Sequence, residues 1–138
     1  MSRFSRACIA HHTLIHSEWR NVDERTPLWP RWFAEAGLHY RPTGSEIVFS
    51  DETHAIQAAA AGQGIALVSL ALVADELATG VLVAALGPAL DGHGFHVVVP
   101  DSRADDGNVE AVREWLSGEA ETFRDAARIL GADAAIVS

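Results

Sequence analysis

AIQAAAAGQGIALV, residues 55–68, predicts an alanine-rich helix, a glycine stop and a short buried strand. Alanine is the best helix former, and the apolar run after the glycines is typical of a strand buried on both faces. Gly62 suits the left-handed position just past a helix end, and Gly64 allows a sharp turn into the strand. This segment therefore predicts a helix followed directly by a strand.

The residues before this helix complete a βαβ unit. Ile47–Phe49 is a strand candidate, and the SDET sequence of residues 50–53 supplies capping oxygens and first-turn acids. The loop at the carboxyl end of a strand in such a unit commonly holds a ligand.

Strands and helices also alternate along the rest of the chain, which predicts an α/β fold. The first of these helices carries an apolar stripe of Trp29, Trp32, Phe33 and Ala36, which we interpret as core. We expect further strands at 13–16, 81–86 and 95–99, helices from Trp29 to Gly37 and from Leu70 to Gly80, and a last helix, capped by Asn108, along 109–123.

Composition restricts the classes of function. The 138 residues suit one domain, and 19 acids against 10 basic residues give a net charge of −9 that repels nucleic acid. No helix-turn-helix pattern precedes the first strand, so we expect no DNA binding by this chain alone. No apolar run approaches the roughly 20 residues of a membrane span, and no secretory signal is evident. Cys8 is the single cysteine, which suits the cytoplasm.

Enzymatic signatures are weak. His93 and His96 form an H-x-x-H pair, but no further ligand lies at metal-binding spacing, so solvated histidines are the better interpretation. Ser69 lacks a nucleophile elbow, and Cys8 lacks a catalytic surrounding. No phosphate-binding or dinucleotide fingerprint is present. We expect no enzyme activity, no cofactor and no metal.

An ordered series of segments resembles the effector-binding domain of LysR-type transcriptional regulators, and within it the subgroup of the glycine-cleavage activator and the β-lactamase regulator. The resemblance runs from about Thr13 to about Phe123. Its segments are WPRWFAEAGL at 29–38, FSD at 49–51, the AIQAAAAGQGIAL run, ELATGVLV at 76–83 and FHVVVP at 95–100.

The resemblance implies a periplasmic-binding-protein-like fold, in which two α/β lobes hold a small-molecule effector in the cleft between them. This chain is similar to the second lobe, with a small mixed sheet flanked by helices, plus a segment that returns to the first. We expect a leader without regular structure at 1–12, the second lobe at 13–100, and a return helix and tail at 101–138. The winged-helix domain, linker helix and most of the first lobe are not found, as in a truncated product or an excised fragment.

Candidate binding residues lie where the predicted strands end. The first group is the strand-to-helix turn of Ser50, Asp51, Glu52 and Thr53, and the second, after the first strand, is His16 and Ser17. Weaker candidates are Val68, Ser69 and Phe95. Ser50 or Asp51 could equally be only the helix cap, and the weaker candidates could be packing residues. The two acids favour an amine or a zwitterion over a strongly anionic ligand.

The resulting hypothesis is an effector-sensing part of a LysR-type regulator, which controls transcription only when joined to a DNA-binding domain. The alternatives are a stand-alone solute-binding fragment, which shares the architecture, and an interaction module. We expect a homodimer or higher oligomer, because the 109–123 helix would expose apolar surface. The same hypothesis places the protein in the cytoplasm with no membrane partner.

Overall fold

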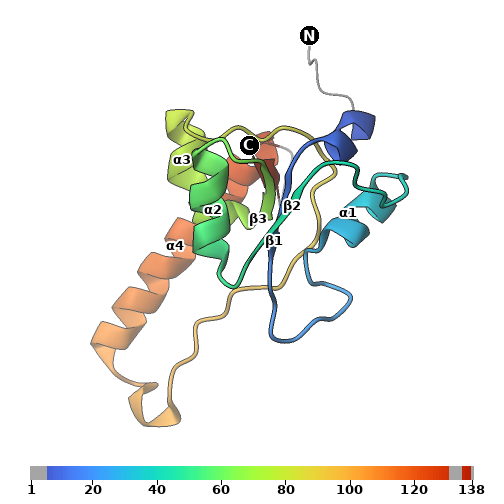
Figure 1. The fold of residues 1–138 in the computed structure, drawn as a ribbon. Helices are drawn as coiled ribbons and strands as arrows, with labels where there is room; N and C mark the ends of the chain where they lie inside the picture. Colours follow the sequence, from blue (N-terminus) through green and yellow to red (C-terminus); the bar gives the residue numbers. More distant parts are fainter. Residues whose placement is uncertain (1–5, 131–134, 138) are drawn as a thin grey trace. The chain divides into compact units, whose positions relative to one another are not determined.

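A computed structural model describes residues 6–130 and 135–137. The chain divides into two compact units, the first formed by residues up to Gly92 together with the C-terminal strand, and the second by residues 93–131. The first unit contains the sheet, and the second contains the long helix α4 (Figure 1). Within the described residues, no helix is both long and apolar enough to cross a bilayer.

The sheet of the first unit is small and mixed, as predicted. Its strand order is β2-β1-β3-β4, and β1 lies parallel to both β2 and β3 while β4 is antiparallel to β3. Ser17 at the end of β1 pairs with Phe49 at the end of β2. The strands are Leu14–Ser17 (β1), Glu46–Phe49 (β2), Ile65–Val68 (β3) and Ala135–Val137 (β4).

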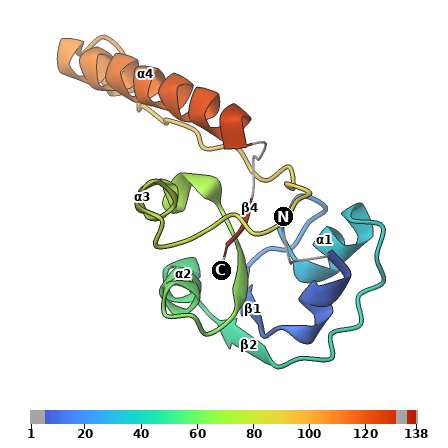
Figure 2. The same ribbon diagram turned by 90° about the horizontal axis from the view of Figure 1, so that it is seen from above.

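Helices lie on both faces of this sheet. Figure 2 shows α1 (Trp29–Glu35) on one face and α2 (Glu52–Ala60) on the other. The glycine stops are confirmed, because Gly37, Gly62 and Gly80 all have positive φ. The remaining helical elements of this unit are the 3-10 helices η1 (Arg6–His11) and η2 (Leu70–Leu72) and the α-helix α3 (Ala74–Thr79).

The aromatic stripe of α1 is core, as predicted. Trp29, Trp32 and Phe33 are buried and pack edge to face on one another, with ring centroids 5.3–6.2 Å apart. Leu14 of β1 and Ile9 of η1 join the same cluster. Residues 6–11, which we expected in a leader without regular structure, form the 3-10 helix η1, whose Ile9 is buried in the core, and residues 1–5 lie outside the described residues.

Gly64 is required by a close approach of two backbones. A Cβ built on Gly64 would lie 2.5 Å from the carbonyl oxygen of Thr13. Ile65 N–H donates to that same oxygen at 2.9 Å, so the entry of β3 is held directly against the entry of β1. Gly64 thus allows β3 to pair closely with β1, whereas the sequence predicted only a sharp turn at this glycine.

The second unit consists of an extended segment, a short 3-10 helix η3 (Asp101–Arg103) and α4 (Gly107–Leu130). The cap of α4 is Asp106 and not Asn108, because the Asp106 carboxylate accepts the Asn108 N–H at 2.9 Å. The helix is present as predicted and amphipathic, but Val112 and Trp115 are largely exposed.

Two predicted strands are wrong. Residues 81–86 contain only an isolated bridge at Ala84. Leu82 is buried, but Val81 and Val83 on either side of it are exposed, and both edges of β3 are already paired, one with β1 and the other with β4. Residues 95–99 have no regular structure, although their composition favours a strand. The described part of their unit, 93–130, contains no strand that could pair with them.

Candidate functional site

The three parallel strands end at one edge of the sheet, which we call the carboxyl edge (residues 16–18, 50–53 and 68–69). Parallel pairing of β1 with β2 and β3 places these turns together. Glu18 N–H also donates to the Phe49 carbonyl oxygen at 2.8 Å, so the turn after β1 is bonded to the last residue of β2. Strand order also reverses at β1, and such switch points are where α/β sheets bind ligands.

Asp51 is the cap of α2. Its carboxylate accepts the Thr53 N–H at 2.7 Å. Hydrogen bonds from the Thr53 hydroxyl and from the Thr53 N–H hold the pKa of the Asp51 carboxyl below its ordinary value, so the side chain is an anion at neutral pH. The capping alternative is therefore true for Asp51, whereas Ser50 is exposed beside it and makes no cap bond.

Glu52 has a different partner. Its Oε1 accepts the N–H of Ser69, the residue that follows β3, at 2.7 Å. Burial raises the pKa of the Glu52 carboxyl, and the Ser69 N–H opposes that effect. This carboxylate links the turn after β2 to the turn after β3.

Ser17 carries an unsatisfied hydroxyl at the carboxyl edge. Its Oγ is buried and has no hydrogen-bond partner among the described residues. Because side chains alternate along a strand, Ser17 shares the face of Ile15, on which α2 lies, and not that of Leu14. Buried polar groups are normally hydrogen-bonded, so this oxygen is the clearest unsatisfied polar group of the edge among the described residues.

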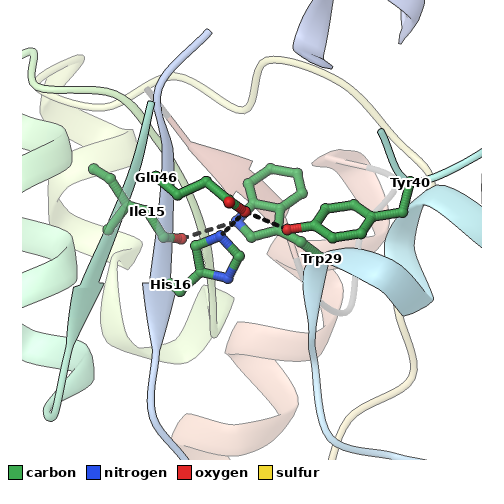
Figure 3. Close-up of polar contacts among 5 residues, drawn as sticks. All are labelled: Ile15, His16, Trp29, Tyr40 and Glu46. Atoms are coloured by element: carbon green, nitrogen blue, oxygen red, sulfur yellow. Dashed lines mark hydrogen bonds and ion pairs between the residues drawn. The ribbon is translucent and has the colours of Figure 1, made fainter. Parts of the chain in front are cut away.

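His16 points to the opposite face. Its Nε2 lies 3.0 Å from Glu46 Oε1, the same carboxylate oxygen that accepts the Tyr40 hydroxyl (Figure 3). Burial, together with the hydrogen bond to Glu46, raises the pKa of the Tyr40 phenol to about 12. Trp29 lies in the same view and donates its ring N–H to the Ile15 carbonyl oxygen at 2.9 Å. The structure therefore separates His16 from Ser17.

The remaining candidates are scattered. Val68 is fully buried, so its side chain is a packing group, and Ser69 is half-buried with its N–H bonded to Glu52. Phe95 is 79% exposed in the second unit. Sequence reasoning did not identify Glu46 or Tyr40, because a strand entry and a loop tyrosine carry no spacing signal. It also did not foresee that Glu52 would bond to a residue 17 positions later.

The second unit has a groove of its own, of about 450 Å³, that contains none of the predicted residues. Its arginines are paired with acids: Arg103 lies 3.4 Å from Asp106, and Arg113 lies 2.8 Å from Glu110. No group of three acids, histidines or cysteines that could hold a metal occurs anywhere in residues 6–130 and 135–137. The groove is lined by Val97, Val98, Val99, Pro100, Arg103, Asp106, Asn108, Val109, Val112 and Arg113.

Comparison with known proteins gives a consistent result. Residues 3–121 match the family described as "LysR substrate binding domain". The chain is 31% identical over 121 residues to the glycine cleavage system transcriptional activator of Escherichia coli K12, covering 84% of this chain and 38% of that protein. It is 31% identical over 113 residues to the transcriptional activator AmpR of Pseudomonas aeruginosa, covering 81% and 36%.

A solved structure supports the same fold. The effector domain of the regulator AmpR of P. aeruginosa superposes with a TM-score of 0.64 at 29% identity, covering 91% of this chain and 57% of that one. The chain thus spans a little over a third of the length of the curated relatives and somewhat more than half of the solved effector domain.

Proposed function

Because the chain belongs to the LysR substrate-binding domain family, we propose that its carboxyl edge forms one wall of an effector site. The observation that carries the proposal is the buried Ser17 Oγ at the switch point of the sheet, which has no hydrogen-bond partner within residues 6–130 and 135–137. Ser50 is exposed on the neighbouring turn and offers a second hydroxyl to the effector. The effector is a small polar molecule held by hydrogen bonds.

The charge of the edge defines the class of effector. Asp51 and Glu52 already accept the Thr53 and Ser69 N–H groups. The Thr53 N–H lies in the first turn of α2 and would otherwise be available to an anion. The effector therefore presents hydrogen-bond donors such as an ammonium group. An amino acid fits this description, and a relative is named for the glycine cleavage system, so glycine is the first probe.

The regulatory role belongs to the full-length protein. We propose that effector binding here controls transcription through a DNA-binding domain, in the cytoplasm. The chain itself has a net charge of −9 and no lysine, and phosphate contacts by lysine and arginine supply most non-specific DNA affinity. A gel shift at physiological salt should show no retained duplex, and a retained duplex would contradict this part of the proposal.

Ser17→Ala tests the effector site. If Ser17 Oγ contacts the effector, the variant should bind glycine or a related amino acid roughly 2- to 12-fold more weakly, since a hydrogen bond contributes about 0.5–1.5 kcal/mol. Stability without ligand should stay equal or rise, because an unsatisfied buried hydroxyl is removed. Affinity is measured by titration of backbone amide resonances, which tolerates weak binding.

Thr122→Ala is the matched control for this experiment. The Thr122 hydroxyl donates to the Gly118 carbonyl oxygen within α4, so its loss should leave probe affinity unchanged. Equal affinities of Ser17→Ala and Thr122→Ala, or no binding of any amino acid probe to the wild type, would refute the proposed site.

Self-association is a second proposed role, favoured by one observation. The second unit exposes Phe95 (79%), Val98 (87%) and Trp115 (63%). Exposed apolar groups of this kind mark interaction surfaces. We expect sedimentation velocity to show a dimer or larger species that Val98→Glu dissociates. Val22→Glu, at a valine 63% exposed in the first unit, should not do so. A monomeric wild type, or equal effects of the two variants, would contradict this role.

A further inference from the structure

The carboxyl edge contains two adjacent carboxylates with different geometries. Asp51 accepts an N–H from its own turn, two residues further along the chain. Glu52 accepts the Ser69 N–H, from a turn that belongs to another strand. The first bond is local to the start of α2, whereas the second joins two of the three turns that form the edge.

In the Ser69 turn, the backbone N–H of Ser69 has its partner in Glu52. Ser69 precedes the 3-10 helix η2 as its cap residue, but its own side chain makes no capping bond. Its N–H is directed to Glu52 Oε1 at 2.7 Å, and Val68 before it and Leu70 after it are buried. The core therefore fixes the two residues on either side, and Glu52 fixes the orientation of the peptide group between them.

Glu52 is also poorly placed to serve as an open ligand contact. The side chain is partly buried, and Oε1 is occupied by the Ser69 N–H. The other charged group acting on it is the carboxylate of Asp51, whose repulsion adds to the effect of burial. The hydrogen bond from the Ser69 N–H opposes both effects, because it favours the ionised form of the Glu52 carboxyl.

We propose that Glu52 is a positioning residue, which ties the Ser69 turn to the Ser50–Thr53 turn and so sets the spacing of the effector wall. This inference rests on the proposed function for its role in binding, but the tie itself is a property of the first unit. It assigns to Glu52 a role that acts through Ser69, and it removes Glu52 from the residues expected to touch the effector directly.

Backbone amide resonances followed against pH test the tie. The Ser69 amide proton should titrate with Glu52, at a higher pH than the Thr53 amide proton titrates with Asp51. Glu52→Gln should abolish the Ser69 titration and leave that of Thr53 intact. Asp51→Asn should do the reverse, which makes it the matched control. Ser69 titration that persists in Glu52→Gln would overturn the proposal.

Hydrogen exchange of the Ser69 amide and affinity for glycine then distinguish a positioning role of Glu52 from direct contact with the effector. Glu52→Gln keeps an oxygen that accepts the Ser69 N–H, so Ser69 hydrogen exchange and glycine affinity should remain within about twofold of wild type. Glu52→Ala removes the acceptor, so Ser69 exchange should accelerate on the order of tenfold and glycine affinity should fall with it. An equal loss of affinity in both variants would overturn positioning in favour of direct contact.

The two proposals fail in distinguishable ways. Faster Ser69 exchange in Glu52→Ala, with no probe bound by any variant, would support the tie and contradict the effector site. Probe binding with unchanged Ser69 exchange and affinity in Glu52→Ala would support the effector site and contradict the tie.

Discussion

The two units of this chain differ in how their apolar residues are used. The first unit contains every buried hydrophobic residue of the described chain except Ala127. The second unit has a 24-residue amphipathic helix and a valine-rich segment, yet exposes Phe95 and Val98 almost completely. Local sequence is thus sufficient to form a helix, but a core forms only where several elements converge, as they do around β1.

A pair of tryptophan substitutions should show the largest contrast between the units. Trp32 is fully buried and its ring N–H donates to the Pro88 carbonyl oxygen at 2.9 Å, so Trp32→Ala should lower the free energy of unfolding by about 3–5 kcal/mol. Trp115 is 63% exposed, so Trp115→Ala should change it by less than about 0.5 kcal/mol. Urea denaturation followed by circular dichroism measures both.

Trp32→Phe is the graded control, since it retains an aromatic ring and removes the hydrogen bond to Pro88. Its loss in free energy of unfolding should lie between those of Trp115→Ala and Trp32→Ala, at about 1 kcal/mol or somewhat more. Comparable losses for Trp115→Ala and Trp32→Ala would show that α4 is packed as tightly as α1, and the contrast between the units would be wrong.

A pair of glycine substitutions should have smaller effects of opposite sign. Gly64→Ala places a Cβ 2.5 Å from the Thr13 carbonyl oxygen and should destabilise by about 1–3 kcal/mol, because two paired backbones must separate. Gly118 lies inside α4 with nothing within 4 Å of a built Cβ, so Gly118→Ala should stabilise by about 0.5–1 kcal/mol. Thermal unfolding of the two variants measures the difference, and a stabilising Gly64→Ala would contradict the close approach of β1 and β3.

The smallest expected effects concern pH. The pKa of Glu52 is raised in the folded protein, so its ionised form is disfavoured there and its contribution to stability is lost as pH rises through the folded pKa. Asp51 behaves oppositely, because its pKa is lowered in the folded protein. Its contribution to stability is present at pH values above the ordinary pKa of Asp, and it is lost as the pH falls through the folded pKa.

Tm measured across pH for two variants tests these signs. Glu52→Gln should match or exceed the wild-type Tm at neutral pH, and the difference should vanish in acid. Asp51→Asn should show its largest deficit at neutral pH, since the charge-assisted cap is absent there. A Glu52→Gln protein that is less stable than wild type only at neutral pH would reverse the sign and refute the account of Glu52.

The sequence was sufficient to predict an element where local conformational preferences and burial favour the same structure. The βαβ unit from Ile47 to Val68 was predicted because a capping turn, an alanine-rich helix and Gly62 each favour the same conformation. The strands expected at 81–86 and 95–99 were wrong because strand formation depends on a partner edge, which is a property of the whole fold.

The candidate site shows the same division. Its turns were predicted at the ends of strands, since parallel strands bring their carboxyl ends to one edge. The partners of individual side chains were not, because they depend on which face each residue takes. His16 bonds Glu46, which also accepts the Tyr40 hydroxyl, whereas the side chain of Ser17, one residue later, lies on the other face of the sheet.

The most direct measurement is a map of backbone amide shifts of the 138-residue chain during titration with glycine and related small amino acids. The account predicts that the largest shifts fall on residues 17–18, 50–53 and 69–70, with residues 97–113 unchanged. Shifts concentrated on the groove of residues 97–113, or none at any concentration, would contradict the assignment of the effector site to the carboxyl edge.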